Sequence, residues 1–167
     1  LRTVASFPRT ATWPPLSSLY VATGLRARGV DASILDLQAE RRPEAEALSG
    51  VGPADLVFLS TADVDRWQCP NVEMGPIDAL AAAVRATGAT FFLTGTHGAV
   101  APEKLLRRTG AHGVIHGEPE EAALALAGGQ EPASIPGLLL REGDGVVDTG
   151  PAPSVDLRRL PAPDYSL

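Results

Sequence analysis

The sequence has few of the residues that build covalent or metal-bound scaffolds. Its 167 residues contain one cysteine, Cys69. A single thiol excludes an internal disulfide, a cysteine-rich zinc site and a self-contained iron–sulfur cluster, which needs about three or four thiolates. The three histidines, His97, His112 and His116, lack the short spacing of a zinc site, and His112 is predicted to lie on the surface. We expect no metal ion to be held by side chains of this chain.

Long apolar runs and basic clusters are also absent. No stretch is long enough for a membrane span or a signal segment, although 44% of the residues are hydrophobic. The net charge is -6, with acids and arginines interspersed, which argues against nucleic-acid binding. We therefore expect one globular, cytoplasmic domain with no membrane or nucleic-acid partner. The chain begins at Leu1 without methionine, and we interpret it as a trimmed piece of a longer bacterial protein.

Short apolar runs alternate with helix-like stretches, a rhythm typical of a parallel sheet wound by helices. The predicted strands are residues 1–7, 32–37, 55–60, 90–93 and 113–116. The predicted helices are residues 15–28, 44–48, 76–87, 102–109 and 118–127. Prolines mark several helix starts and glycines several ends. The sequence predicts an α/β fold: a doubly wound, parallel, five-stranded sheet in the flavodoxin-like order 2-1-3-4-5, with any ligand at the carboxyl ends of the strands.

The alternation of apolar runs and helix-like stretches ends after Ala127. Residues 135–150 predict two short strands around the turn of Gly143, Asp144 and Gly145. The remainder is punctuated by proline and has no helical period. We divide the chain into a sheet domain (1–130), a β-hairpin (131–150) and a connector (151–167) to a second domain outside this sequence.

Two strand-to-helix loops are candidates for ligand binding. The first carries the hydroxyls of Thr12 and Ser17 beside Trp13, at a helix start that could bind a phosphate or amide group, although a plain helix cap would explain them equally. The third, residues 60–76, is longer than such connections usually are, and long loops tend to be functional. We interpret Cys69 in that loop as an ordinary thiol, because no base can be assigned to it.

Glycines after the last two parallel strands are the stronger signal. Gly95, Gly98 and Gly117 would let a broad ligand approach the backbone closely. No segment has the spacing G-x-G-x-x-G, which makes a dinucleotide site a weak interpretation. Glu118 and Glu120 could act as acid–base groups, but acids in a first helical turn are also favoured by the helix dipole.

Several segments in succession resemble the N-terminal cobalamin-binding domain of cobalamin-dependent radical S-adenosylmethionine enzymes. They are "WPPLSSLYVATGLRARGVDASILDL", "ADLVFLST", "ATFFLTGTHGAVAPEKLL", "GAHGVIHGEPEEAALALA", "IPGLLLREGDGVV" and "DLRRLPAPDYSL". The resemblance implies a Rossmann-like domain that holds the corrin face against the strand ends and inserts the dimethylbenzimidazole tail into the sheet edge. The family often has Gly-Gly-Pro-His where residues 94–97 of this chain are Thr-Gly-Thr-His. It often has Gly-Glu-Gly-Glu where residues 117–120 are Gly-Glu-Pro-Glu, and Pro119 lacks an amide donor.

The expected cofactor-binding residues follow from this resemblance and from the loops. They are Thr12, Trp13, Ser17, Ser60, Thr61, Ala62, Asp63, Arg66, Trp67, Thr94, Gly95, Thr96, His97, Gly98, His116, Gly117, Glu118 and Pro119. Among them, Ser60, Thr61, Thr94, Gly95 and Gly117 are expected to line the groove for the nucleotide tail. We expect Arg66 or Trp67 to lie under the lower face of the corrin. The alternative is that Arg66 pairs with Asp63 or Asp65 on the surface.

Another class of cobalamin protein carries D-x-H-x-x-G after the first strand, with the histidine as lower cobalt ligand. The corresponding loop here, "FPRTATWPP", has no histidine. The resemblance therefore implies cobalamin with its base displaced and no protein ligand on cobalt. It also implies a neighbouring radical SAM domain of the same polypeptide, with a 4Fe-4S cluster and S-adenosylmethionine, that methylates a small-molecule or peptide substrate, and we expect a role in natural-product biosynthesis. This chain alone is not expected to be active.

Two rival interpretations remain from the residues. A flavodoxin-like electron carrier would use the hydroxyls of Thr10, Thr12 and Ser17 for a flavin phosphate. A noncatalytic interaction module would bind neither flavin nor corrinoid. A receiver domain is excluded, because the chain has no acid between Leu1 and Val30 and the third predicted strand ends in Ser60 and Thr61.

Overall fold

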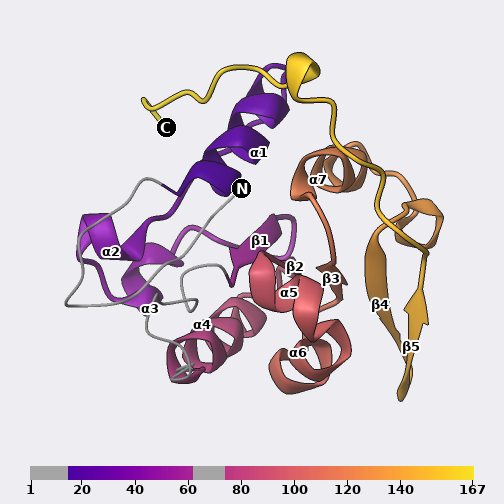
Figure 1. Cartoon of the computed structure of the whole chain (residues 1–167). Coiled ribbons are helices and arrows are strands. Elements are labelled where there is room, and N and C mark those ends of the chain that lie inside the picture. The colour runs from indigo at the N-terminus through magenta and orange to yellow at the C-terminus, as the bar shows by residue number, and fades with distance from the viewer. Residues whose placement is uncertain (1–14, 62–73) are drawn as a thin grey trace.

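A five-stranded sheet in the order β1-β2-β3-β4-β5 forms the centre of the computed structural model, which describes residues 15–61 and 74–167. The first three strands are parallel, and the last two are antiparallel (Figure 1). Their bounds are β1 Leu56–Ser60, β2 Thr90–Thr94, β3 Gly113–Ile115, β4 Leu138–Glu142 and β5 Gly145–Asp148.

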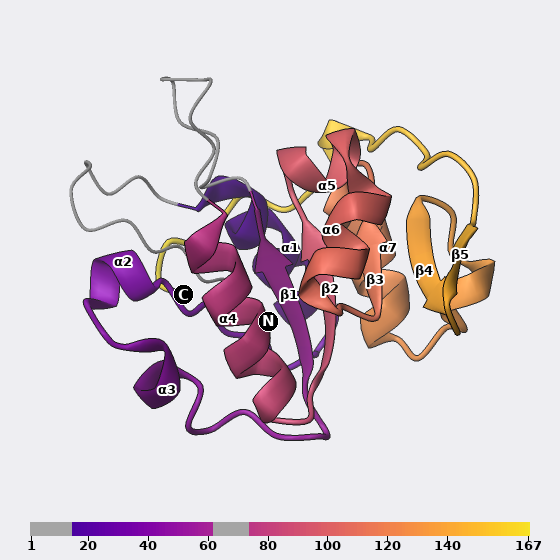
Figure 2. The same ribbon diagram turned by 90° about the horizontal axis from the view of Figure 1, so that it is seen from below.

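Helices cover both faces of this sheet. One face carries α1 (Leu16–Arg26) and α7 (Pro119–Ala127), and the other carries α4 (Gly75–Ala86) and α6 (Pro102–Thr109), as Figures 1 and 2 show. The short helices are α2 (Leu37–Glu40), α3 (Glu44–Ala47), α5 (Thr96–Val100) and the 3-10 turns Pro132–Ser134 and Leu157–Arg159. None of the described helices is long and apolar enough to cross a membrane.

The two faces have separate apolar clusters because side chains alternate along each strand. In β1, Val57 and Leu59 pack on the α4–α6 side, whereas Phe58 packs on the α1–α7 side. In β2 the alternation repeats, and Phe92 meets Phe58 with ring centroids 6.3 Å apart. Both strands are buried apart from their first residues, as expected for parallel strands covered on both faces.

The helix boundaries confirm the predictions from proline and glycine. Proline occupies the first turn of α4, α6 and α7. Gly110 ends α6 in the left-handed conformation, with φ 69°, which an L side chain adopts only at a cost. The α/β class and the parallel order of the last three predicted strands are likewise confirmed.

The predicted strand at 32–37 is wrong. Residues 31–36 have no regular structure, and α2 begins at Leu37. The apolar pattern correctly indicated burial, since Ala32 and Leu35 are buried, but burial does not require ladder hydrogen bonds. Its expected neighbour, the predicted strand at 1–7, lies outside the described residues.

The predicted hairpin around Gly143 is confirmed and proves to be part of the main sheet, because β4 pairs with β3. The connector then runs back over the domain and is fixed at both ends: Gly137 N–H donates to Gly150 O (2.9 Å), and Asp164 N–H donates to Thr23 Oγ1 in α1 (2.9 Å). Figure 1 shows this yellow segment passing over α7 towards α1.

Candidate functional site

A groove of about 900 Å³ opens at the carboxyl ends of the parallel strands. Four parts of the chain form it: the start of α1, the turn from β2 into α5, the turn from β3 into α7, and the connector after β5. The lining residues are Ser17, Gly95, Thr96, Ala99, His116, Gly117, Glu118, Pro119, Asp148, Gly150, Pro151, Ala152, Pro153 and Ser154. Strand ends of an α/β sheet are where such folds bind their ligands.

Exposed backbone contributes to this groove at two elements. The N-cap of α1, Pro15, makes no side-chain cap, and the amides of the first turn beside Ser17 have no partner within the helix. Gly95 leaves β2 with φ 94° and ψ -178°, a conformation open almost only to glycine. Both elements therefore present backbone rather than bulky side chains to the groove.

His116 directly follows β3, and its side chain lies against Asp148 at the end of β5. Its Nε2 lies 3.3 Å from Asp148 Oδ1, with the imidazole side chain 18% exposed. The separation suits an ion pair with a protonated ring, although the two groups are not aligned as a hydrogen bond. Asp148 Oδ1 also accepts from Gly150 N–H (2.9 Å), which fixes the carboxylate at the start of the connector.

Gly117 also has a structural role, which the sequence did not predict. A Cβ at this position would lie 2.5 Å from Cβ of Ala152, and one at Gly137 would lie 2.6 Å from the same atom. The absence of a side chain at both glycines thus accommodates the connector, which forms one wall of the groove. Gly117 still contributes its backbone to the lining.

A narrow slot adjoins the groove between α1, α7 and the sheet. It shares Ser17 and Pro119 with the groove and has a volume of only about 10 Å³. Its other lining residues are Ser18, Val21, Phe58, Thr94 and Ala123. The walls are mostly apolar, so widening the slot would create a site for a flat, apolar group.

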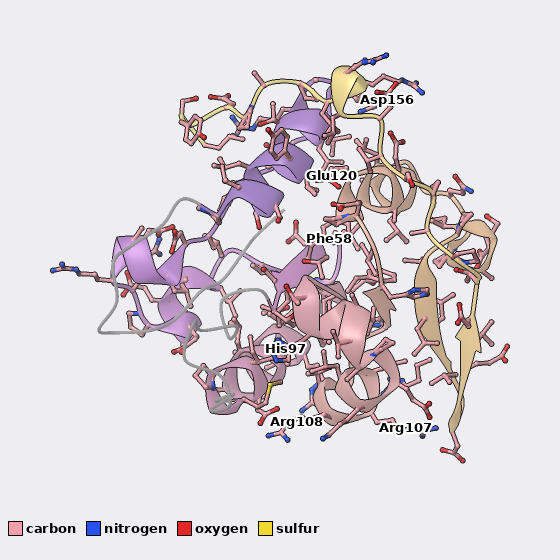
Figure 3. All side chains as sticks on the ribbon, in the orientation of Figure 1. Phe58, His97, Arg107, Arg108, Glu120 and Asp156 are labelled. Atoms are coloured by element: carbon pink, nitrogen blue, oxygen red, sulfur yellow. The ribbon has the colours of Figure 1, made fainter. Side chains whose placement is uncertain are left out.

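Glu120 is a buried acid of α7 and follows Pro119, which lines the slot. Its side chain lies between α1 and α7 (Figure 3), and the residue is 6% exposed. Oε2 has no hydrogen-bond partner among the described residues. Burial raises the pKa of this carboxyl, and the charges of Glu118 and Glu121 raise it further. The net direction is upward, so burial outweighs the opposing hydrogen bond to the backbone of Glu120.

A second cavity, of about 110 Å³, lies on the outer side of the α1–α7 seam. Glu120 and Glu121 line it together with Arg28 and Arg159, and the connector closes it at Pro161.

The structure brings seven of the predicted site residues together in the groove: Ser17, Gly95, Thr96, His116, Gly117, Glu118 and Pro119. Thr94 lines the slot instead. The remaining described residues lie elsewhere. Thr61 is fully buried and donates from Oγ1 to Thr94 O (2.6 Å), and Ser60 is buried at the end of β1. Gly98 packs α5 on β3, where a Cβ would be 3.0 Å from Val114.

Six predicted residues lie outside the described part of the chain: Thr12, Trp13, Ala62, Asp63, Arg66 and Trp67. The expectation about the lower corrin face falls among them and stays a prediction.

The other two histidines lie away from the groove. His97 lies on the α4 side in Figure 3 and is not part of the groove lining. His112 is exposed as predicted, and its Nδ1 accepts from Phe91 N–H (3.1 Å), which ties the start of β3 to β2. In the described ranges 15–61 and 74–167, no three His, Cys, Asp or Glu side chains gather as a metal site.

The sequence did not predict one wall of the groove. The end of the hairpin and the connector form this wall through Asp148 and residues 150–154. Nothing local in the sequence marks it, because the contact depends on β4 pairing with β3. The glycines at 117 and 137 were the available signal, since two glycines far apart in sequence can admit one intruding side chain.

Comparison with known proteins points to one family. The model of the B12 binding domain matches residues 3–127. No protein with a curated description matches the chain. The radical S-adenosylmethionine methyltransferase TsrM from Kitasatospora setae, solved with cobalamin and a [4Fe-4S] cluster, superimposes with a TM-score of 0.75 over 97% of this chain at 21% identity. The cobalamin-dependent S-adenosylmethionine radical enzyme OxsB, solved with aqua-cobalamin and S-adenosylmethionine, gives a TM-score of 0.67 over 97% at 15% identity.

At these identities the structural likeness establishes the fold. This chain spans 30% of the TsrM chain and 23% of the OxsB chain, so it corresponds to less than a third of either. The family match confirms the resemblance to cobalamin-binding domains seen in the sequence.

Proposed function

Because this chain belongs to the B12 binding domain family, we propose that it binds cobalamin with the base displaced and without a histidine on cobalt. We propose further that it is the cobalamin domain of a cytoplasmic radical SAM methyltransferase. The observation that carries the proposal is the groove of about 900 Å³ at the carboxyl ends of β2 and β3. A sheet of this kind binds its ligand at that edge, and the family to which the chain belongs is named for binding B12.

The residues present suit a corrinoid. The groove is wide and open to backbone at Gly95 and at the start of α1, so a broad ring can approach without meeting large side chains. Ser17, Thr96 and the turn after His116 offer hydroxyl and amide groups at its edge. The adjoining slot between Val21, Phe58 and Ala123 suits the apolar benzimidazole of the tail.

At about 10 Å³, the slot is too narrow for a ring. Insertion of the base therefore requires α1 to move away from α7 or Phe58 to rotate.

When bound, cobalamin would supply a cobalt-carried methyl group for transfer to a substrate. The role of this chain is to hold the corrin, keep its lower face free of a nitrogen ligand and exclude water. The loop at 62–70 remains our candidate for that face, through Arg66 or Trp67. A guanidinium stays protonated and has no lone pair for a metal, so Arg66 could fill the space without ligating cobalt.

The 4Fe-4S cluster, S-adenosylmethionine and the substrate would be bound by a radical SAM domain of the same polypeptide. TsrM and OxsB support this assignment because the matched part of each is joined to further chain. We propose a small-molecule or peptide substrate in bacterial natural-product biosynthesis. A tryptophan methyltransferase of thiopeptide biosynthesis is one candidate, since TsrM was solved with tryptophan as its substrate.

The direct test is ligand binding by the purified chain. Titration with hydroxocobalamin and, separately, with flavin mononucleotide, each followed by gel filtration, should give co-elution of the corrinoid only. Co-elution of flavin alone would establish the electron-carrier alternative, and a chain that retains neither would support the interaction module.

A further inference from the structure

The cavity of about 110 Å³ on the outer side of the α1–α7 seam is separate from the groove at the strand ends, because the two share no lining residue. An engineered protein cavity of about 150 Å³ holds benzene, so this space suits a molecule of about five or six non-hydrogen atoms. Its apolar walls are Val21, Leu124, Leu160 and Pro161.

Four charged side chains line this cavity without neutralising one another. Arg28 follows α1, and Arg159 belongs to the connector. The two acids, Glu120 and Glu121, lie in the first turn of α7. Among the ion pairs of the described residues, none joins one of these arginines to one of these acids. The two positive and two negative charges cancel, so the cavity suits a molecule that carries one group of each sign.

Glu120 is the buried member of this set. The residue is 6% exposed, and Oε2 has no hydrogen-bond partner among the described residues. A buried oxygen without a donor is unfavourable, and a hydrogen bond from a charged donor would offset that cost. Glu121 is exposed and would add negative charge at the rim.

Gly24 leaves space free at the same seam. It lies in the interior of α1 and lines the cavity, although glycine costs a helix stability relative to alanine. A Cβ at this position would lie 3.9 Å from Nη1 of Arg28 and 3.9 Å from Cδ1 of Leu124, which are ordinary contacts. Alanine would therefore fit here and fill part of the cavity. Arg28 Nη1 also donates a long hydrogen bond to Gly24 O (3.4 Å), which holds the guanidinium along the seam.

We propose that this cavity binds a small zwitterion, with a compact α-amino acid as the chemical class. The ammonium group of the ligand donates to Glu120, and its carboxylate accepts from Arg28 and Arg159. A guanidinium matches a carboxylate in both charge and planar shape. The site does not depend on cobalamin binding. Because it is formed by α1, α7 and the connector, an occupied cavity holds the connector on the domain.

The test is a titration of the isotope-labelled chain with L-alanine, followed by heteronuclear NMR at neutral pH and constant ionic strength. Amide signals of Gly24, Glu121 and Leu160 should shift and saturate, with a dissociation constant on the order of millimolar for a ligand of this size. L-Alaninamide lacks the carboxylate, and propionate lacks the ammonium group. Each should bind at least about tenfold more weakly, the change expected for loss of one charged hydrogen bond.

Gly24→Ala separates a ligand site from a void of the fold. The variant should melt about 2–4 °C higher than the wild type, because alanine favours the helix. It should also bind L-alanine at least about tenfold more weakly, because the new methyl group occupies the cavity. A variant that is more stable and yet binds less cannot be explained by damage to the fold.

Two further variants test the charges. Glu120→Gln and Arg159→Gln keep the approximate size of each side chain, remove its charge, and should each weaken L-alanine binding about tenfold. Arg158→Gln is the matched control, because Arg158 is the neighbour in the same 3-10 turn and is not part of the cavity lining. It should bind L-alanine as the wild type does.

The proposal is wrong if L-alanine causes no saturable shift, or if L-alaninamide or propionate binds as tightly. It is also wrong if Gly24→Ala or Glu120→Gln keeps the wild-type affinity. Cobalamin binding is measured on the same sample of protein. Cobalamin binding without L-alanine binding would remove this site alone, and L-alanine binding without cobalamin binding would remove the proposed function alone.

Discussion

The two faces of the sheet are built for different purposes. On the α4–α6 face, Leu106 and Val84 are completely buried, and Arg108 clamps Asp78 with Nε 2.6 Å from Oδ1. On the α1–α7 face, a slot lies beside Phe58, and the carboxyl of Glu120 is buried with no hydrogen-bond partner for Oε2 among the described residues. The apolar cluster of the α4–α6 face stabilises the fold, whereas the face with a slot and a buried carboxyl is the one expected to accept a ligand.

The largest expected effect concerns the α4–α6 face. Leu106→Ala would leave a cavity in a fully buried cluster and should lower the free energy of unfolding by about 2–5 kcal/mol. Urea denaturation measures the loss. Cobalamin affinity of the remaining folded protein should not change, and a parallel loss of affinity would show that the two faces are not separable.

Gly95→Ala should affect stability and binding together. Its φ of 94° with ψ -178° strains any L side chain, which costs roughly 1–3 kcal/mol, and the new methyl group stands at the groove. We expect cobalamin to bind at least roughly tenfold more weakly. Gly129→Ala is the matched control, because this glycine also has a positive φ of 78° but follows α7 away from the groove. Equal affinities for the two variants would remove Gly95 from the site.

Glu120→Gln should stabilise the chain near neutral pH by about 1 kcal/mol, because burial penalises the charged carboxylate and leaves its Oε2 without a hydrogen-bond partner among the described residues. Burial raises the pKa of Glu120. The native state then favours the protonated carboxyl, so its contribution is complete below the unfolded pKa of about 4.3 and is lost as the pH rises through the folded pKa.

Melting temperatures measured from acid to neutral pH test this sign. The wild type should fall progressively below Glu120→Gln as the pH rises, and the variant Glu131→Gln, which removes an exposed acid that does not act on Glu120, should follow the wild type. A gap between wild type and Glu120→Gln that is constant with pH would contradict the burial argument.

The smallest effect should come from Arg108→Ala. Its ion pair with Asp78 is partly exposed, with side chains 44% and 35% accessible, and such pairs contribute about 0–1 kcal/mol. Chemical denaturation should detect little change, and cobalamin binding none. A loss of unfolding free energy well above this range would mean that the ion pair contributes more to the stability of this face than its exposure indicates.

Much of the fold could be read from local sequence. Prolines at helix starts, Gly110 at the end of α6 and the buried runs of β1 and β2 all act over a few residues, and their elements were predicted to within one or two positions. Residues 32–37 were misread because apolar alternation reports burial, and a strand also needs a partner to pair with.

The candidate site was only partly predictable. Gly95 and His116 could be placed because strand ends of a parallel sheet meet at one edge. The connector wall could not, because Ala152 reaches Gly117 only after β4 has paired with β3. The burial of Glu120 could not be predicted either, since it depends on how α1 packs on α7.

The state of cobalt in the bound cofactor tests the account most directly. The chain loaded with cobalamin and reduced to cob(II)alamin should give an electron paramagnetic resonance spectrum without axial nitrogen superhyperfine splitting, because the base is displaced and no histidine replaces it. His97→Ala should give the same spectrum. A nitrogen splitting in the wild-type spectrum would contradict the account, and its disappearance in His97→Ala would identify that histidine as the ligand.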